Sequence, residues 1–243
     1  MTYEYLVFNG KSSLDFETWI SGTGTFDSPE RDVENISVPG RSGDLIVDNK
    51  RFLNVAVTYP AFIVKNFKAN FDALKAFLLA EAGYHRLEDS YHPEHFRLAQ
   101  FKGAIKPDMR ALNRSGSFDL VFDCKPQRYL KSGEKQISLA PGMNDPVRIK
   151  NPTLYDAMPL LRIYGTGTLD IDGQSITITQ ADGYTDFDCD LMNAYKDNPA
   201  VSKNQYVSTS QTESIVLKPG INNFILTASG ITSVIVAPRW YTI

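Results

Sequence analysis

The chain has 243 residues, of which 42% are hydrophobic and 22% charged, and its formal net charge is −3. These values are typical of a folded globular protein and exclude a wholly disordered chain. Lys and Arg are not concentrated in any segment, which argues against direct recognition of nucleic acid by a basic face.

The sequence also bears on membranes and on the redox compartment. No apolar run approaches the roughly 20 residues of a transmembrane helix, so we expect no membrane insertion. Residues 1–10 lack the basic start and apolar run of a signal peptide. The two cysteines, Cys124 and Cys189, are far apart, unlike the closely spaced cysteines of a secreted disulfide scaffold. We therefore expect the protein to fold in a reducing cytoplasm.

Alternating apolar residues predict strands in the first half of the chain. The pattern covers residues 3–8, 51–59 and 117–124. The side chains expected to share a face are Leu53, Val55, Val57 and Tyr59 in one strand, and Phe118, Leu120, Phe122 and Cys124 in another. Residues 21–32 are rich in Gly, Ser, Thr and charge, which predicts a turn or an extended arm.

One segment, residues 66–82, has the spacing of an amphipathic helix. The apolar stripe consists of Phe67, Phe71, Leu74, Phe77 and Leu78. Asn66 is placed to cap the start, and Gly83 can adopt the left-handed conformation at the end. We expect this helix to pack across a sheet.

A change in composition suggests a domain boundary. Residues 131–152 contain Pro141, Pro146 and Pro152 and show little apolar periodicity. We therefore predict a first domain of residues 1–132, a linker of residues 133–152, and a second domain of residues 153–243.

The sequence of the second half of the chain predicts many short strands. Residues 160–164 form one candidate, and residues 167–178 form a hairpin that turns at Asp172 and Gly173, a pair suited to a two-residue turn. That turn places Leu169 opposite Ile176, with Ile171 on the same face. Further strands are expected at residues 214–217, 223–228 and 233–237, with turns at Pro219-Gly220 and Ser229-Gly230. This pattern predicts a β-sandwich.

Candidate chemical groups favour structural roles. His85, His92 and His95 lie close together, but their spacing matches no strong metal motif, and we favour structural histidines over a metal site. Carboxylates could be paired for glycoside hydrolysis, although acidic residues at turns are the commoner explanation; they are Asp170, Asp172, Asp186, Asp188 and Asp190. Acidic neighbours would raise the pKa of Cys189, which argues against a reactive thiolate. We expect no catalytic site and no cofactor.

One loop, Pro39-Gly40-Arg41-Ser42-Gly43, lacks the complete phosphate-loop pattern and predicts a tight turn. Its Arg41 could pair with a carboxylate of a neighbouring subunit.

Several segments, in this order along the chain, resemble the distal tail protein (Dit) family of long-tailed, non-contractile bacteriophages. They are residues 38–45 followed by the strand of residues 53–59, residues 84–90 with 92–94 and 96–99, residues 122–130, residues 151–153 with 159–160 and 164–165, residues 217–222 and residues 238–240. The resemblance implies a mainly β protein with two domains. The first would be a sandwich or split-barrel-like domain with one helix, and the second a galectin-like β-sandwich.

The resemblance further implies a structural protein of the virion, assembled in the host cytoplasm and located at the distal end of the tail. A homohexameric ring would join the tail tube protein to a tail-tip or tail-associated protein and to a receptor-binding protein. Candidate subunit-interface residues are Arg41, Asp44 and Arg86. The alternatives are a carbohydrate-binding module, with Trp240 as a saccharide or interface anchor, and a hydrolase that uses the His or Asp clusters.

Overall fold

The structure is a computed structural model that describes residues 4–22, 25–110, 112–140, 146–227 and 230–243. The chain forms two compact units, Met1–Arg128 with Ile243, and Tyr129–Thr242. Strands dominate both units, and the described residues contain one α-helix. The expected mainly β class with two domains is confirmed.

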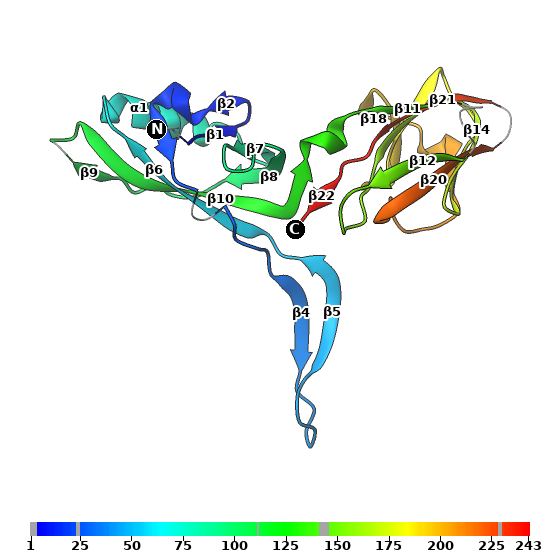
Figure 1. Ribbon diagram of the computed structural model, residues 1–243, viewed down its shortest axis with the longest axis horizontal. Coiled ribbons are helices and arrows are strands. Elements are labelled where there is room, and N and C mark those ends of the chain that lie inside the picture. The colour runs from blue at the N-terminus through cyan, green and yellow to red at the C-terminus, as the bar shows by residue number, and fades with distance from the viewer. Residues whose placement is uncertain (1–3, 23–24, 111, 141–145, 228–229) are drawn as a thin grey trace. The chain divides into compact units, whose positions relative to one another are not determined.

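The first unit is built on a large antiparallel sheet with the strand order β2-β1-β7-β8-β10-β6-β3, and β9 pairs with β10 (Figure 1). Its elements are β1 (Leu6–Phe8), β2 (Lys11–Ser12), η1 (Ser13–Phe16), β3 (Thr18–Ile20), β6 (Val55–Ile63), α1 (Phe67–Leu78), β7 (His85–Asp89), β8 (His95–Phe101), β9 (Asp108–Arg110) and β10 (Ser115–Leu130). Two further strands, β4 (Arg31–Ile36) and β5 (Leu45–Phe52), form a separate hairpin.

The core of the first unit follows the predicted alternation. The alternating residues of β10 from Phe118 to Cys124 are all buried, and β6 buries Val55, Val57 and Tyr59 opposite them. Phe122 lies at the centre, with its ring centroid 5.1 Å from that of Phe8. Leu53, expected on the same face as Val55, is instead exposed because the chain leaves the β5 strand there before β6 begins.

Helix α1 buries the predicted stripe, but it is shorter than expected. Phe67, Phe71, Leu74 and Leu78 are buried, and Phe77 packs against the same core. Asn66 precedes the helix with a φ of 48° and makes no side-chain cap hydrogen bond. The helix ends at Leu78, after which the Ala80 N–H donates to the Phe77 carbonyl at 3.3 Å, an i→i−3 bond in place of the helical i→i−4 pattern. Gly83 has the expected positive φ, 105°, but lies beyond the helix end.

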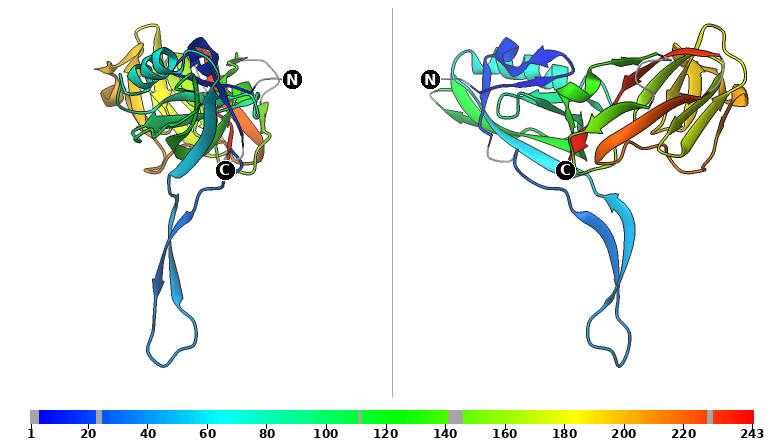
Figure 2. Two further views of the ribbon diagram at one scale, coloured as in Figure 1. Left: turned by 90° about the vertical axis from the view of Figure 1, so that its left-hand side faces the viewer. Right: turned by 45° about the vertical axis from the view of Figure 1, so that its right-hand side comes forward.

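The second unit is a sandwich of two antiparallel sheets (Figure 2). One has the order β11-β21-β13-β16-β17-β18 and the other β12-β20-β14-β15-β19. The elements are η2 (Lys131–Glu134), β11 (Ile137–Leu139), β12 (Val147–Asn151), β13 (Leu160–Gly165), β14 (Gly167–Ile171), β15 (Gln174–Ile178), β16 (Tyr184–Asp188), β17 (Asn193–Lys196), β18 (Asn198–Ser202), η3 (Asn204–Tyr206), β19 (Val207–Thr209), β20 (Gly220–Thr227), β21 (Ile231–Ala237) and β22 (Tyr241–Thr242). Buried side chains from both sheets, among them Leu161 and Phe224, form one core.

The predicted hairpin is present in the predicted register. Leu169 pairs with Ile176 across β14 and β15, and both are buried together with Ile171. Asp172 and Gly173 have φ values of 48° and 87°, as a two-residue turn with two positive φ angles requires. The predictions of β13, β20 and β21 are confirmed to within a few residues, and the expected turn residue Ser229 lies outside the described residues.

Two segments differ from expectation. Residues 133–152, expected as a linker, contribute β11 and β12, and buried Leu139 and Ile149, to the second sandwich. The strand expected at residues 214–217 is reduced to an isolated bridge between Ala157 and Leu217. There the side-chain amide of Gln174 forms the hydrogen bonds that a neighbouring strand would form. It accepts from the Val216 N–H and donates to the Val216 carbonyl, both at 2.9 Å.

Candidate interaction surfaces

The β4–β5 hairpin of the first unit is exposed along almost its whole length. Within the described residues, β4 and β5 pair only with each other. Two cross-strand ion pairs hold the ribbon together: Arg31 Nη1 lies 2.7 Å from Asp48 Oδ2, and Arg51 Nε lies 2.6 Å from Asp32 Oδ2. Surface ion pairs contribute little to stability. An isolated two-stranded hairpin is only marginally stable in water. The conformation of this ribbon therefore depends on further contacts.

Several apolar side chains on the hairpin are exposed to solvent. Ile46 has 66% of its surface exposed. The exposed apolar residues of the hairpin and its loop are Val33, Ile36, Val38, Leu45, Ile46 and Val47. A run of exposed apolar residues on a strand with free edges is a surface that another chain can cover.

Of the turn or extended arm expected at residues 21–32, the structure has the turn. Residues 21–32 contain a turn, in which the Thr25 N–H donates to the Gly22 carbonyl at 3.1 Å and Thr25 is buried. The extended arm is instead residues 31–52. The apolar run Leu45-Ile46-Val47, followed by the polar residues 48–51, does not alternate, because neither face of this ribbon is buried.

The predicted tight turn lies at the tip of this hairpin. Gly40 and Gly43 have φ values of 81° and 83°, and the Arg41 N–H donates to the Val38 carbonyl at 3.1 Å. Arg41 and Asp44 are both exposed at the tip. Positive φ is a conformation that glycine adopts without strain, which explains the two glycines on either side of Arg41.

Arg86, the third candidate interface residue, belongs to a different element. It lies in β7, where its Nε donates to Glu88 Oε1 at 2.5 Å and its guanidinium lies 3.8 Å from the Phe96 ring centroid. Arg41 and Asp44 thus both lie exposed at the hairpin tip, whereas Arg86 is engaged within the central sheet.

Trp240 is a core residue of the second unit. Only 5% of its surface is exposed, and it packs in the cluster formed by the two sheets. Its carbonyl accepts a hydrogen bond from the Leu130 N–H at 2.8 Å. The indole is therefore covered by the protein's own side chains and offers no free face for stacking on a sugar.

Two of the three candidate histidines, His92 and His95, belong to a polar cluster in the first unit, whereas His85 lies in β7 with its Nε2 3.9 Å from Glu81 Oε2. Arg128 Nη1 lies 3.3 Å from the ring nitrogens of His92, and the rings of His92 and His95 lie 6.4 Å apart. Burial and the nearby Arg128 charge lower the pKa of both histidines. Asp89 accepts from Tyr59 Oη at 2.9 Å and from the His92 N–H at 2.9 Å. The described residues contain no group of three or more His, Cys, Asp or Glu placed to hold a metal ion.

The aspartates of the second unit have structural partners. Asp170 accepts from the Gly173 N–H at 2.9 Å, and Asp172 accepts from Asn223 Nδ2 at 2.8 Å. Asp186 and Asp188 each form a two-point ion pair with an arginine. Carboxylates held in this way position strands and turns.

Both cysteines are free and buried. Burial raises the pKa of the Cys124 thiol to about 12. Burial, followed by the Asp188 charge, raises the pKa of the Cys189 thiol. The predicted direction for Cys189 is confirmed, and its largest cause is burial, with the acidic neighbours second.

Comparison with protein families and with curated protein sequences gives no match. Solved structures do match over the whole chain. The SPP1 Dit protein, described as a paradigm of hub adsorption apparatus in phages infecting Gram-positive bacteria, aligns with a TM-score of 0.70, 14% identity and 100% coverage of both chains. The fold is that of SPP1 Dit.

The phage P2 baseplate in its activated conformation provides two further matches. The structure with Ca aligns with a TM-score of 0.51 and 11% identity, and covers 97% of this chain and 98% of that chain. The structure with Sr aligns with a TM-score of 0.51, 10% identity and the same coverage. At these identities the matches establish the fold, which agrees with the resemblance in the sequence. No helix in the described part of the chain is long and apolar enough to cross a membrane.

Proposed function

We propose that this chain is a structural hub protein of a bacteriophage tail, of the Dit type. Six copies would form a ring at the distal end of the tail, between the tail tube and the tail tip or baseplate. The observation that carries this proposal is the fold likeness to SPP1 Dit over the full length of both chains. The likeness to the phage P2 baseplate supports it.

A closed ring of identical subunits needs two different complementary surfaces on each subunit. The β4–β5 hairpin supplies the first, because it carries exposed apolar side chains and two free strand edges. We propose that it docks on the next copy of the chain, with Arg41 and Asp44 at its tip making polar contacts. Arg86 would contribute to the receiving surface through the part of its side chain that remains exposed.

The proposed partners follow from this position. They are the tail tube protein on one side and a tail-tip or tail-associated protein on the other, with a receptor-binding protein attached to the assembly. The role is structural, and no catalytic step is proposed for the His, Cys or Asp groups, which are engaged in the cores and turns described above.

The mass of the full chain in solution tests the ring. Light scattering after gel filtration, with native mass spectrometry, is expected to give about 163 kDa, six times the 27.2 kDa of one chain. Negative-stain images are expected to show rings with six-fold symmetry. A strict monomer at high protein concentration, both alone and with the tail tube protein, would contradict the proposal.

The hairpin is tested by the double variant Leu45→Asp/Ile46→Asp. Both side chains are exposed in the single chain, so the melting temperature of the monomer should not change, whereas the ring should be lost. A matched control is Leu154→Asp, an exposed residue of the second unit, which should leave the ring intact. A ring that persists in the double variant would exclude the hairpin as a ring contact.

A further inference from the structure

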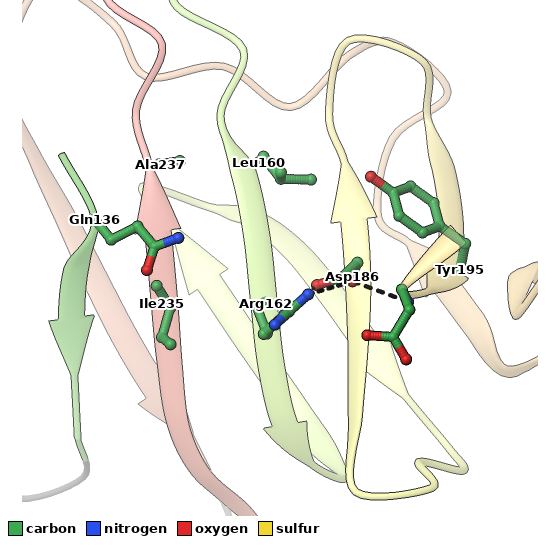
Figure 3. Close-up of a pocket in the computed structure, with 8 residues that line it drawn as sticks. Gln136, Leu160, Arg162, Asp186, Tyr195, Ile235 and Ala237 are labelled. Atoms are coloured by element: carbon green, nitrogen blue, oxygen red, sulfur yellow. Dashed lines mark hydrogen bonds and ion pairs between the residues drawn. The ribbon is translucent and has the colours of Figure 1, made fainter. Parts of the chain in front are cut away.

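A pocket of about 200 Å³ lies on the outer face of the six-stranded sheet of the second unit. Its centre is a row of four residues that face one another across four strands (Figure 3). Ile235 of β21 pairs with Arg162 of β13, Arg162 pairs with Asp186 of β16, and Asp186 pairs with Tyr195 of β17. The residues between them along each strand, such as Leu161 and Phe187, point into the sandwich core.

The polar part of the pocket is held rigidly. Arg162 Nε and Nη2 donate to the two carboxylate oxygens of Asp186 at 2.7 and 2.9 Å. The Asp186 side chain is only 4% exposed, and the Asp197 N–H also donates to it at 3.3 Å. The Arg162 guanidinium lies 4.3 Å from the Tyr184 ring centroid. A two-point pair of this kind fixes both groups in one geometry, so further donors and acceptors are presented in fixed directions.

The pocket also has an apolar part. Leu160, Ile235 and Ala237 form its floor, and the Tyr195 ring stands at one side (Figure 3). Gln136 adds an amide at the opposite side. An aromatic ring beside a few fixed polar groups is the composition of a small-molecule site, with the ring giving contact area and the polar groups giving orientation.

Charge decides which chemistry the pocket favours. Arg162 is the one basic residue among the described lining residues, and Asp186 neutralises it. Asp197 leaves a net negative charge, which disfavours anionic ligands. A ligand with several hydroxyl groups on a compact ring can use carboxylate acceptors, amide donors and an apolar face at once. The small volume suits one such ring, because pockets for drug-sized ligands are larger, about 300–1,000 Å³.

We propose that this pocket binds one neutral pyranose unit of a saccharide, with its apolar face against Tyr195 and its hydroxyl groups toward Arg162, Gln136 and the exposed carboxylate of Asp197. This site differs from the saccharide anchor expected at Trp240, which is buried. It goes beyond the proposed hub role and does not depend on it, because the pocket lies within a single copy of the second unit.

The test uses the full chain, labelled with ¹⁵N and titrated with methyl glucoside, methyl galactoside and N-acetylglucosamine at millimolar concentrations. At least one of these neutral sugars should shift the amide signals of β13, β16 and β17 in a saturable manner. Tyr195→Ala should weaken the binding at least about tenfold, since it removes the stacking surface. Tyr195→Phe keeps the aromatic ring of the side chain and should retain most of the binding affinity. The matched control is Tyr206→Ala, a tyrosine of the same unit outside the pocket.

Each outcome bears on the proposal. Saturable binding that is lost in Tyr195→Ala and kept in Tyr206→Ala supports it, provided that both variants melt as the parent does. If Tyr195→Ala unfolds, Ala237→Phe replaces it, because the added ring fills the pocket floor. Absence of saturable shifts with all three sugars overturns the proposal, as does binding that neither pocket variant weakens. Binding of a cationic amino sugar alone, glucosamine for example, would show a cation site and overturn it too. Light scattering on the same samples measures the subunit ring, so loss of sugar binding can be distinguished from loss of ring formation.

Discussion

Asp188 and Arg239 form a two-point ion pair that fastens the last segment of the chain to β16 of the second unit. Arg239 Nη1 and Nη2 donate to the two Asp188 carboxylate oxygens at 2.8 and 3.0 Å, and the Asp188 side chain is 9% exposed. The Arg239 N–H also donates to the Gly133 carbonyl at 2.9 Å. The pair holds Trp240, the next residue, in the core.

Asp188→Asn is expected to lower the free energy of unfolding of the second unit by about 2–4 kcal/mol, because the substitution leaves a partly buried arginine without its counter-charge. Urea unfolding followed by tryptophan fluorescence in a Trp19→Phe background, where Trp240 of the second unit is the one tryptophan, measures it. The control Asp182→Asn removes the charge of an exposed ion pair with Lys196 in the same unit and should lower the free energy of unfolding far less, because exposed ion pairs contribute little to stability. Equal losses in the two variants would contradict this account of the pair.

Both thiols are expected to be unreactive in the folded protein. Burial holds the pKa of the Cys124 thiol at about 12, and burial also raises that of Cys189, so the thiolate that reacts is almost absent at neutral pH. A colorimetric thiol assay should find no reactive cysteine in the native chain and both cysteines after unfolding in guanidinium. Rapid modification of one thiol in the native chain would show that its part of the core opens.

Stability should fall on mild acidification. Burial, and then the charge of Arg128, lower the folded-state pKa of His92 and His95, so the unfolded chain binds protons more readily. The free energy of unfolding should therefore decrease as the pH drops below the unfolded value of about 6.5, and this contribution should level off below the folded pKa.

Thermal melts at about pH 7.5, 6.5 and 5.5 measure this effect. The double variant His92→Gln/His95→Gln should show a smaller change in melting temperature across that range. An equal change in the parent and the variant would assign the pH dependence to other groups.

Gly173→Ala should lower the free energy of unfolding of the second unit by about 1–2 kcal/mol. No heavy atom lies within 4 Å of an added Cβ, so the cost arises from the φ of 87° alone. Gly103→Ala is the matched control, because φ there is not positive and the nearest heavy atom lies 3.8 Å away. It should stay within about 0.5 kcal/mol of the parent. Chemical denaturation of both variants gives the comparison, and a Gly173→Ala protein as stable as the parent would exclude turn strain.

Much of the secondary structure was predictable from local pattern. The alternation from Phe118 to Cys124 and the helical spacing of Phe67, Phe71 and Leu74 specify which side chains are buried, because a strand repeats every two residues and a helix every 3.6. The Asp172-Gly173 turn specifies its register because only residues that tolerate positive φ close a two-residue loop. These elements depend on neighbours close in sequence, and the structure has them where they were expected.

Other features depend on strands that are far apart in sequence. Nothing local marks Val216 as a residue whose backbone is paired by the Gln174 side chain, and so a strand was predicted there. The proline-rich residues 133–152 lack clear periodicity, yet β11 and β12 find partners in β21 and β20. The exposed hairpin was missed because neither of its faces is buried, and burial is what gives a strand its alternating pattern.

The candidate sites also differ in whether local sequence or long-range contacts determine them. Sequence alone predicted that Arg41 lies on a tight turn of residues 39–43, where Gly40 and Gly43 permit positive φ, and it favoured structural roles for the aspartates and histidines. Only the tertiary structure buried Trp240, and only it aligned Ile235, Arg162, Asp186 and Tyr195 into one row. A residue's side of a strand is a local property, whereas its partners across the sheet are decided by the cooperative packing of the whole core.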